Sequence, residues 1–171
     1  TKFGDQALTD QAFAKASHVV EHEFYIQRVT GVTMEPRSAL GSYDADAGKF
    51  TLIAGSGGAV RQQSEIAAVL GIDTSDIRVI SPDVGGNFGT RNRVYIEFGL
   101  VLFAAKKINR PVKFTATRSE SFLTDYQGRD LVTNIALALD GNGKFLGLKC
   151  DNISNVGAHC VSLSPLGKGS G

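Results

Sequence analysis

The residues best suited to chemistry lie in a glycine-rich stretch at residues 80–91. Its candidate binding residues are Gly85, Gly86, Asn87, Phe88 and Gly89. Glycine has no Cβ, so a ligand can approach its backbone N–H and C=O groups closely. A short apolar run at 77–80 precedes the stretch, and a long helical pattern follows it. A turn between a strand and a helix N-terminus carries unpaired amides, which suits it to cradle an anion or a flat cofactor.

Two familiar phosphate-binding loops do not match this spacing. The glycines give G-G-x-x-G, whereas a dinucleotide-binding loop has G-x-G-x-x-G, and no Gly-Lys-Ser/Thr follows to complete a Walker A loop. A structural explanation also exists, because a tight turn needs glycine wherever φ is positive. The glycines alone therefore leave a binding loop and a structural turn both open.

The periodicity of apolar residues predicts one α/β domain over residues 1–171, with two layers and a mixed β-sheet that has helices packed on one face. Helices are expected at residues 11–16, 59–70, 94–108 and 118–126, and strands at 18–30, 39–43, 49–54, 77–80, 112–116, 131–139 and 145–155. We expect Asp10 to cap the first helix. Residues 1–8 and 166–171 are expected to be flexible.

Composition narrows the class of protein. The chain has 171 residues, of which 42% are hydrophobic, and its 18 basic and 17 acidic residues create no field that would gather nucleic acid or a membrane surface. No apolar run approaches the roughly 20 residues of a membrane span, and we expect a cytoplasmic protein.

Cys150 and Cys160 are expected to be buried, reduced thiols on strands. Since the chain lacks an initiator Met, we expect it to be a segment of a longer protein.

Other motifs accompany the glycine-rich stretch in order. Met-Glu-Pro-Arg stands at residues 34–37, Ser-Pro-Asp-Val-Gly-Gly-Asn-Phe-Gly at 81–89, and Gly-Arg-Asp at 128–130. This succession resembles the molybdopterin-binding large subunit of molybdenum hydroxylases, the xanthine oxidase, aldehyde oxidase and carbon monoxide dehydrogenase family. The chain is most similar to bacterial carbon-monoxide-dehydrogenase-type subunits, whose loop usually reads GGGFG. The resemblance runs from about residue 13 to about residue 159.

The resemblance implies an oxidoreductase that hydroxylates a substrate carbon with oxygen from water. It implies molybdenum held by molybdopterin cytosine dinucleotide, with the backbone at residues 85–89 beside it. Iron–sulfur and flavin subunits and the remainder of the molybdopterin-binding subunit would be its partners. The family's glutamate base lies further toward the C-terminus than residue 171, so we expect no catalytic residue and no metal ligand here. The isolated chain should be inactive and should self-associate through apolar surface near the glycine turns, around Ile53, Val60, Val84 and Phe88.

Three positions depart from the family pattern. Asn87 replaces the usual loop glycine. Gly57 stands where many members have a glutamine that hydrogen-bonds the oxo group of the metal. Asn92 stands where purine-oxidising members have a substrate-binding glutamate, which argues against a purine substrate. Gln62 and Gln63 are expected to be solvent-exposed helix residues, and the alternative is that one of them replaces the missing glutamine.

The remaining polar residues suit structural roles. Glu35 and Arg37 are expected to form an ion pair or a capping interaction. His18 and His22 should face solvent on a strand and hold no metal. The plausible carboxylates, none expected beside a histidine or in a carboxylate pair, are Glu35, Glu65, Asp83 and Glu97.

Two alternatives to a molybdenum hydroxylase remain. One is a non-catalytic α/β interaction or structural domain with an incidental glycine turn, and the other is a different nucleotide-binding enzyme. The molybdenum and pterin content of the purified full-length subunit would separate these possibilities.

Overall fold

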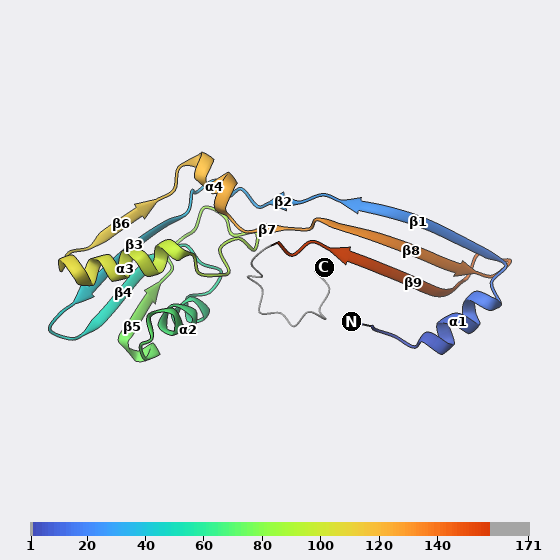
Figure 1. Cartoon of the computed structure of the whole chain (residues 1–171), viewed down its shortest axis with the longest axis horizontal. Helices are drawn as coiled ribbons and strands as arrows, with labels where there is room; N and C mark the ends of the chain where they lie inside the picture. The colour runs from blue at the N-terminus through green and yellow to red at the C-terminus, as the bar shows by residue number, and fades with distance from the viewer. Residues whose placement is uncertain (1, 158–171) are drawn as a thin grey trace. The chain divides into compact units, whose positions relative to one another are not determined.

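The computed structural model describes residues 2–157 of the chain, with the elements in the order drawn in Figure 1. The chain divides into two compact units. The central unit holds residues from Thr30 to Gln127, and the terminal unit combines residues up to Val29 with those from Gly128 on. The chain passes between them at β2 (Val29–Thr30) and β7 (Gln127–Gly128), which pair with each other. A single domain over residues 1–171 stays a prediction.

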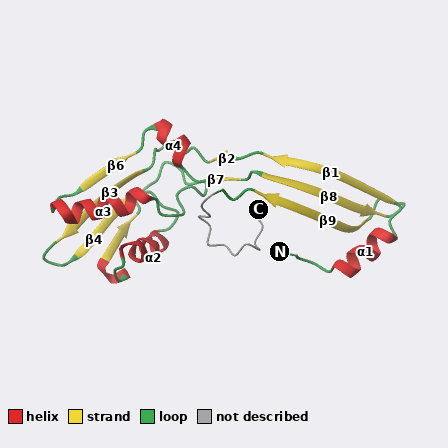
Figure 2. Cartoon of the chain, in the orientation of Figure 1, coloured by secondary structure: helices red, strands yellow, loops and turns green. Residues whose placement is uncertain are grey.

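The central unit is built on a four-stranded mixed sheet in the order β5-β4-β3-β6. Its strands are β3 (Ser38–Asp44), β4 (Lys49–Ala54), β5 (Ile77–Ile80) and β6 (Val112–Thr115). β4 and β5 are parallel, and β3 is antiparallel to both β4 and β6. The unit also contains the helices α2 (Ala59–Leu70), α3 (Ile96–Ile108) and α4 (Arg118–Thr124), and Figure 2 distinguishes helices from strands by colour. A 3₁₀ turn, η1, covers Thr74–Asp76. The predicted mixed α/β fold is confirmed.

Strict alternation buries one side of this sheet against α2 and α3. On β4, Phe50, Leu52 and Ala54 are buried, while the residues between them are not. They pack with Ile66 of α2 and with Phe98, Val101 and Leu102 of α3. Gly41 of β3 lets α3 approach closely, since a Cβ there would lie 2.8 Å from the carbonyl carbon of Val101. The core of the central unit thus lies between the sheet and the two helices.

The terminal unit contains a three-stranded antiparallel sheet in the order β1-β8-β9. The strands are β1 (His18–Ile26), β8 (Leu131–Leu139) and β9 (Phe145–Ser154). The turn between β8 and β9 is closed by Asp140, whose carboxylate accepts hydrogen bonds from the backbone of Asn142 and Lys144. Helix α1 (Gln6–Ala14) packs on β9, where Lys149 pairs with Asp10 at 2.8 Å. None of the helices among the described residues is long and apolar enough to cross a membrane.

Two sequence expectations in this unit are wrong. The cap of α1 is Asp5, whose carboxylate accepts from the backbone of Leu8 at 2.9 Å, and not Asp10. The apolar pattern starts later than the helix, which hid its true first turn. Cys150 lies on a strand as expected, but it is exposed, because its face of β9 is uncovered. Cys160 and residues 166–171 lie outside the described residues, and flexibility of residues 1–8 stays a prediction.

Candidate cofactor-binding loop

The glycine-rich loop leaves β5 and adopts positive φ at three positions. These are Gly86 (φ 113°), Phe88 (φ 48°) and Gly89 (φ 89°). Phe88 is the one of these three residues that is not glycine, and a left-handed backbone conformation is uncommon for a residue with a Cβ. The Phe88 side chain is 77% exposed. The loop holds this aromatic ring at the surface through an unusual backbone conformation.

Asn87 organises the loop through its side chain. Its Oδ1 accepts hydrogen bonds from the backbone N–H of Gly89 at 3.2 Å and of Arg91 at 3.1 Å. Its backbone carbonyl accepts from the N–H of Thr90 at 2.9 Å. Its Nδ2 donates to Oδ1 of Asn92 at 2.8 Å. Asn87 thus holds the turn together, and direct contact between Asn87 and a cofactor stays a prediction.

Glu35 clasps the start of the loop. Its backbone N–H donates to the carbonyl of Gly85 at 3.2 Å, and its carboxylate accepts from the N–H of Gly85 at 2.6 Å. A Cβ on Gly85 would lie only 2.5 Å from the Cβ of Glu35, so this contact requires glycine. The expected Glu35–Arg37 pair is wrong, because Arg37 bonds Glu97 and Asp125 instead. Glu35 and Arg37 of the Met-Glu-Pro-Arg motif therefore have different partners.

A buried cluster of charges lies behind the loop. The Arg37 side chain is 1% exposed and pairs with Asp125 and, at 2.7 Å, with Glu97. Its guanidinium carbon lies 4.2 Å from the centre of the Tyr95 ring. Burial acts to lower the pKa of Arg37, but its bonds to Glu97 and Asp125 outweigh burial and raise the pKa. The arginine is therefore held charged and fixed.

Arg91 connects this cluster to both motifs. It pairs with the second carboxylate oxygen of Asp125 at 3.0 Å. It also donates to the hydroxyl of Thr33 at 2.8 Å and to the carbonyl of Glu35 at 3.1 Å. Two arginines and two carboxylates, with Glu97 as the second, balance the buried charge, which is the condition for burying ions. The loop is thereby tied to a rigid interior.

The ring of Tyr95 completes the support. Its hydroxyl donates to the carbonyl of Thr90 at 2.6 Å. Burial raises the pKa of Tyr95, so its hydroxyl remains protonated and keeps this bond at neutral pH. The Tyr126 ring stacks on it with centroids 4.3 Å apart. Sequence reasoning missed Arg91, Tyr95 and Asp125, because a polar residue that follows a glycine turn or a short helix gives no sign of partners 30 or more residues away.

The face of the loop offers backbone donors. The N–H groups of Gly86, Asn87 and Phe88 have no hydrogen-bond partner within residues 2–157. Successive backbone amides beside left-handed residues are a common element of anion-binding sites in proteins. A Cβ on Gly86 would lie 2.9 Å from the ring of Phe88, so this surface also depends on glycine. Binding of an anionic, oxygen-rich group by this loop stays a prediction.

The second glycine turn, residues 55–58, lies beside the loop. The backbone N–H of Gly57 donates to the carbonyl of Arg91 at 3.3 Å. Gln62 is buried and not solvent-exposed as expected: its Nε2 donates to the carbonyl of Gly55 at 3.2 Å. Its Oε1 is buried with no partner among the described residues. Gln63 donates to the carbonyl of Ile77 at 2.7 Å, so both glutamines position backbone.

Glu65, another of the plausible carboxylates, has a structural role. Glu65 pairs with Arg93 at 2.7 Å and with Arg61 at 3.1 Å. Burial acts to raise the pKa of Glu65, but these hydrogen bonds outweigh it and lower the pKa. Asp83 is exposed. In the described part of the chain, no group of three or more His, Cys, Asp or Glu residues could hold a metal ion.

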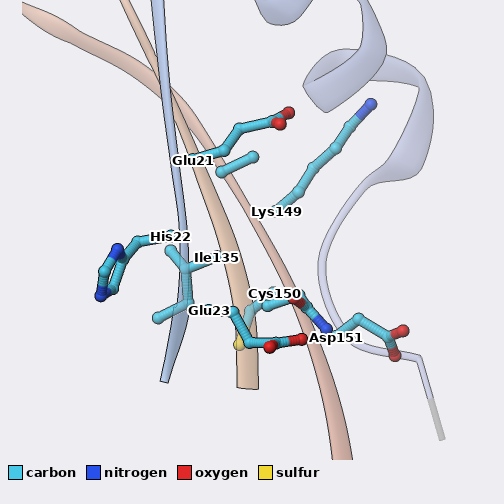
Figure 3. A pocket seen from close by; sticks show the side chains of 9 residues that line it. Glu21, His22, Glu23, Ile135, Lys149, Cys150 and Asp151 are labelled. Carbon is cyan, nitrogen blue, oxygen red and sulfur yellow. The ribbon is translucent and has the colours of Figure 1, made fainter. Parts of the chain in front are cut away.

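A separate hollow of about 450 Å³ lies on the terminal unit. Figure 3 shows Glu21 and Lys149 on one side of the strands and His22 on the other. It contains none of the residues expected to bind a cofactor. The residues expected to bind a cofactor, 85–89, lie in the central unit.

The fold and the loop match a known class of protein. The model of the molybdopterin cofactor-binding domain family matches residues 1–168, and the chain belongs to this family. It is 33% identical to the 6-hydroxypseudooxynicotine dehydrogenase complex subunit gamma of Paenarthrobacter nicotinovorans, over 92% of this chain and 20% of that protein. It is 31% identical to the carbon monoxide dehydrogenase large chain of Hydrogenophaga pseudoflava, over 95% and 20% respectively. The chain spans about a fifth of the length of these relatives.

Solved structures show the same fold. Quinoline 2-oxidoreductase from Pseudomonas putida 86 matches with a TM-score of 0.80 and 30% identity, over 85% of this chain and 18% of that chain. The Cu,Mo-CO dehydrogenase in its carbon monoxide reduced state matches with a TM-score of 0.82 and 30% identity, over 87% and 19%. The resemblance to molybdenum hydroxylases that the motifs predicted is confirmed.

Proposed function

We propose that this chain is part of the cofactor-binding subunit of a bacterial, carbon-monoxide-dehydrogenase-like molybdenum hydroxylase, and that residues 85–89 lie beside the molybdenum centre. One observation carries the proposal: three adjacent amides have no hydrogen-bond partner among residues 2–157, in a loop that a buried ion cluster fixes. Preorganised amide donors bind anionic oxygens without further ordering. The names of the relatives, a carbon monoxide dehydrogenase among them, support this function.

The residues divide the work of holding the cofactor. The amides of Gly86, Asn87 and Phe88 would donate to its oxygens, and the exposed ring of Phe88 would exclude water from one side. Bound there, the cofactor supplies two-electron oxidation of a substrate carbon with oxygen from water. The chain supplies binding and orientation, and the general base lies elsewhere in the proposed subunit. We propose molybdopterin cytosine dinucleotide as the cofactor form, iron–sulfur and flavin subunits as partners, and a cytoplasmic location.

The test compares two glycines with the same backbone requirement. Gly89 (φ 89°) and Gly143 (φ 82°) both have open space where a Cβ would stand, and only Gly89 is in the loop. Each Gly→Ala variant should lose about 1–3 kcal/mol of stability, since each is strained in the left-handed region. Only Gly89→Ala should also lose molybdenum, measured by elemental analysis of the full-length subunit, and pterin, measured by fluorescence after oxidation.

The outcomes separate the proposal from its alternative. Stoichiometric molybdenum in Gly89→Ala would reduce the loop to a structural turn. A wild-type subunit with neither molybdenum nor pterin would favour a non-catalytic α/β interaction or structural domain. The isolated chain should show no turnover of aldehydes, purines or carbon monoxide, even with added cofactor, because proton transfer by a general base contributes about 10²–10⁴-fold.

A further inference from the structure

Residues 57, 87 and 92, the three positions that depart from the related sequence pattern, meet at one point of the central unit. A Cβ built on Gly57 would lie 1.9 Å from Oδ1 of Asn92 and 2.3 Å from Nδ2 of Asn87. Real Cβ atoms do not approach other heavy atoms within 3.0 Å. The two asparagine amides therefore occupy the space into which a side chain at position 57 would project.

Backbone conformation does not explain the glycine at this position. Gly57 is not in the left-handed region, so a positive φ is not what requires glycine there. Its N–H donates to the carbonyl of Arg91, a bond that every residue except proline could make. What requires glycine at position 57 is the space that the asparagines fill.

The asparagines cannot easily turn aside. Oδ1 of Asn87 is bonded to the N–H groups of Gly89 and Arg91, and Nδ2 of Asn87 is bonded to Asn92. Rotating Asn87 away would break three hydrogen bonds, each of which contributes to the loop. Asn92 is exposed, and for its Nδ2 no bond is recorded among residues 2–157. One N–H₂ group of the bridge thus remains available at the surface.

We propose that the Asn87–Asn92 amide bridge is a specificity-determining element of the loop. It excludes any side chain from position 57, and the Nδ2 of Asn92 donates to the oxygen-rich ligand of the loop in place of such a side chain. The second half of this inference rests on the proposed function. The first half concerns the polypeptide alone.

Exclusion is tested by a double-mutant cycle on thermal stability. Gly57→Ala should lower Tm by about 3 °C or more. Gly58→Ala is the matched control, because Gly58 is extended (φ 161°) and has open space around its Cβ position. In an Asn92→Ala background, the effect of Gly57→Ala should be smaller, since the contact at 1.9 Å is gone and only the Nδ2 of Asn87, at 2.3 Å, remains in the way. Equal losses in both backgrounds, or no difference between the two glycine variants, would overturn the exclusion.

Donation is tested with a variant that keeps the bridge. Asn92→Asp retains the oxygen that accepts from Asn87 and removes the N–H₂ group. Its Tm should stay within about 1 °C of the wild type at neutral pH, while molybdenum and pterin in the full-length subunit fall to less than half. Asn92→Asp with full cofactor content would overturn the donor role. A wild-type subunit free of molybdenum would instead overturn the proposed function, and the thermal cycle would still decide the exclusion.

Discussion

The β-sheets of the two units differ in how much of their surface is covered by other elements. In the central unit, alternate residues of β4 are buried beneath two helices. In the terminal unit, every residue of β1 is exposed, as are all residues of β9 except Gly147. Ion pairs follow the same division: both side chains of Arg37–Asp125 are 1% exposed, whereas Arg28 and Asp130 are 40% and 38% exposed.

This difference shows where a binding loop needs its support. The candidate loop belongs to the unit that closes its own core, and its backbone is tied to buried charges through Arg91. Fixed donors bind a ligand without the entropic cost of ordering them. The terminal sheet has open surface and no comparable buried cluster of charges among its described residues.

The largest expected effect comes from breaking the buried pair. Arg37→Ala would leave Asp125 short of one partner and Glu97 without its own, and we expect a loss of about 3–5 kcal/mol in unfolding free energy. Arg28→Ala breaks the exposed pair of the terminal unit and should cost under about 1 kcal/mol. Urea denaturation of both variants measures the contrast. Similar losses would mean that the two units are stabilised alike.

The next comparison concerns two glycines, one in each unit, at which a strand lies close to a helix. Gly41→Ala pushes a Cβ to within 2.8–2.9 Å of the backbone of Val101 and Leu102, which α3 cannot move without disturbing the core. Overpacking of this kind costs about 1–3 kcal/mol. A Cβ on Gly147 would lie 3.1 Å from the Cβ of Ala12 and 3.6 Å from the ring of Phe13, and α1 has no buried residue to hold it in place. Gly147→Ala should therefore be the milder variant in thermal melts, and the reverse order would place the firmer packing in the terminal unit.

A smaller effect should appear as a dependence on pH. Because the folded pKa of Glu65 lies below its ordinary value of 4.5, its contribution is present above that value. It is lost as the pH falls through the lower, folded pKa. Since the pair is partly exposed, we expect less than about 1 kcal/mol. Glu65→Gln should flatten this part of the stability curve between pH 6 and about pH 3, and an unchanged slope would show that other groups dominate.

Local patterns were sufficient to predict most elements of the central unit. Helix α2 and strands β4 and β5 have the predicted bounds, since alternation, helical spacing and a following glycine are all read from neighbouring residues. Gly71 ends α2 in the left-handed conformation, as a C-terminal glycine does. The glycine-rich turn was located for the same reason. The family to which the chain belongs was predicted from the three sequence motifs and their order along the chain.

The sequence did not predict which side chains contact each other or which of them are buried. Arg91 and Asp125 are 34 residues apart, and no periodicity indicates that they meet. Gln62 carries a polar side chain on a helix, which favours exposure, yet the turn at Gly55 folds over it. Cys150 lies on a strand whose cover depends on what packs against it. These outcomes depend on tertiary contacts, which a single sequence does not contain.

The smallest effect on stability, with a distinct effect on association, is expected on the open face of the terminal sheet. Val20, Leu137 and Leu148 are direct cross-strand neighbours in one row, on the face opposite α1, and Val20 and Leu148 are 59% exposed. Contiguous apolar surface promotes association. Val60 and Phe88 of the central unit are also exposed, at 77% each. Leu148→Ser should change the unfolding free energy by no more than about 0.5 kcal/mol, because little apolar surface is buried there. Sedimentation of the dilute chain should nevertheless show weaker self-association in Leu148→Ser than in the control Val60→Ser. If Val60→Ser were the variant that dissociates, the interacting surface would lie beside the glycine turns, and the open terminal sheet would need another partner.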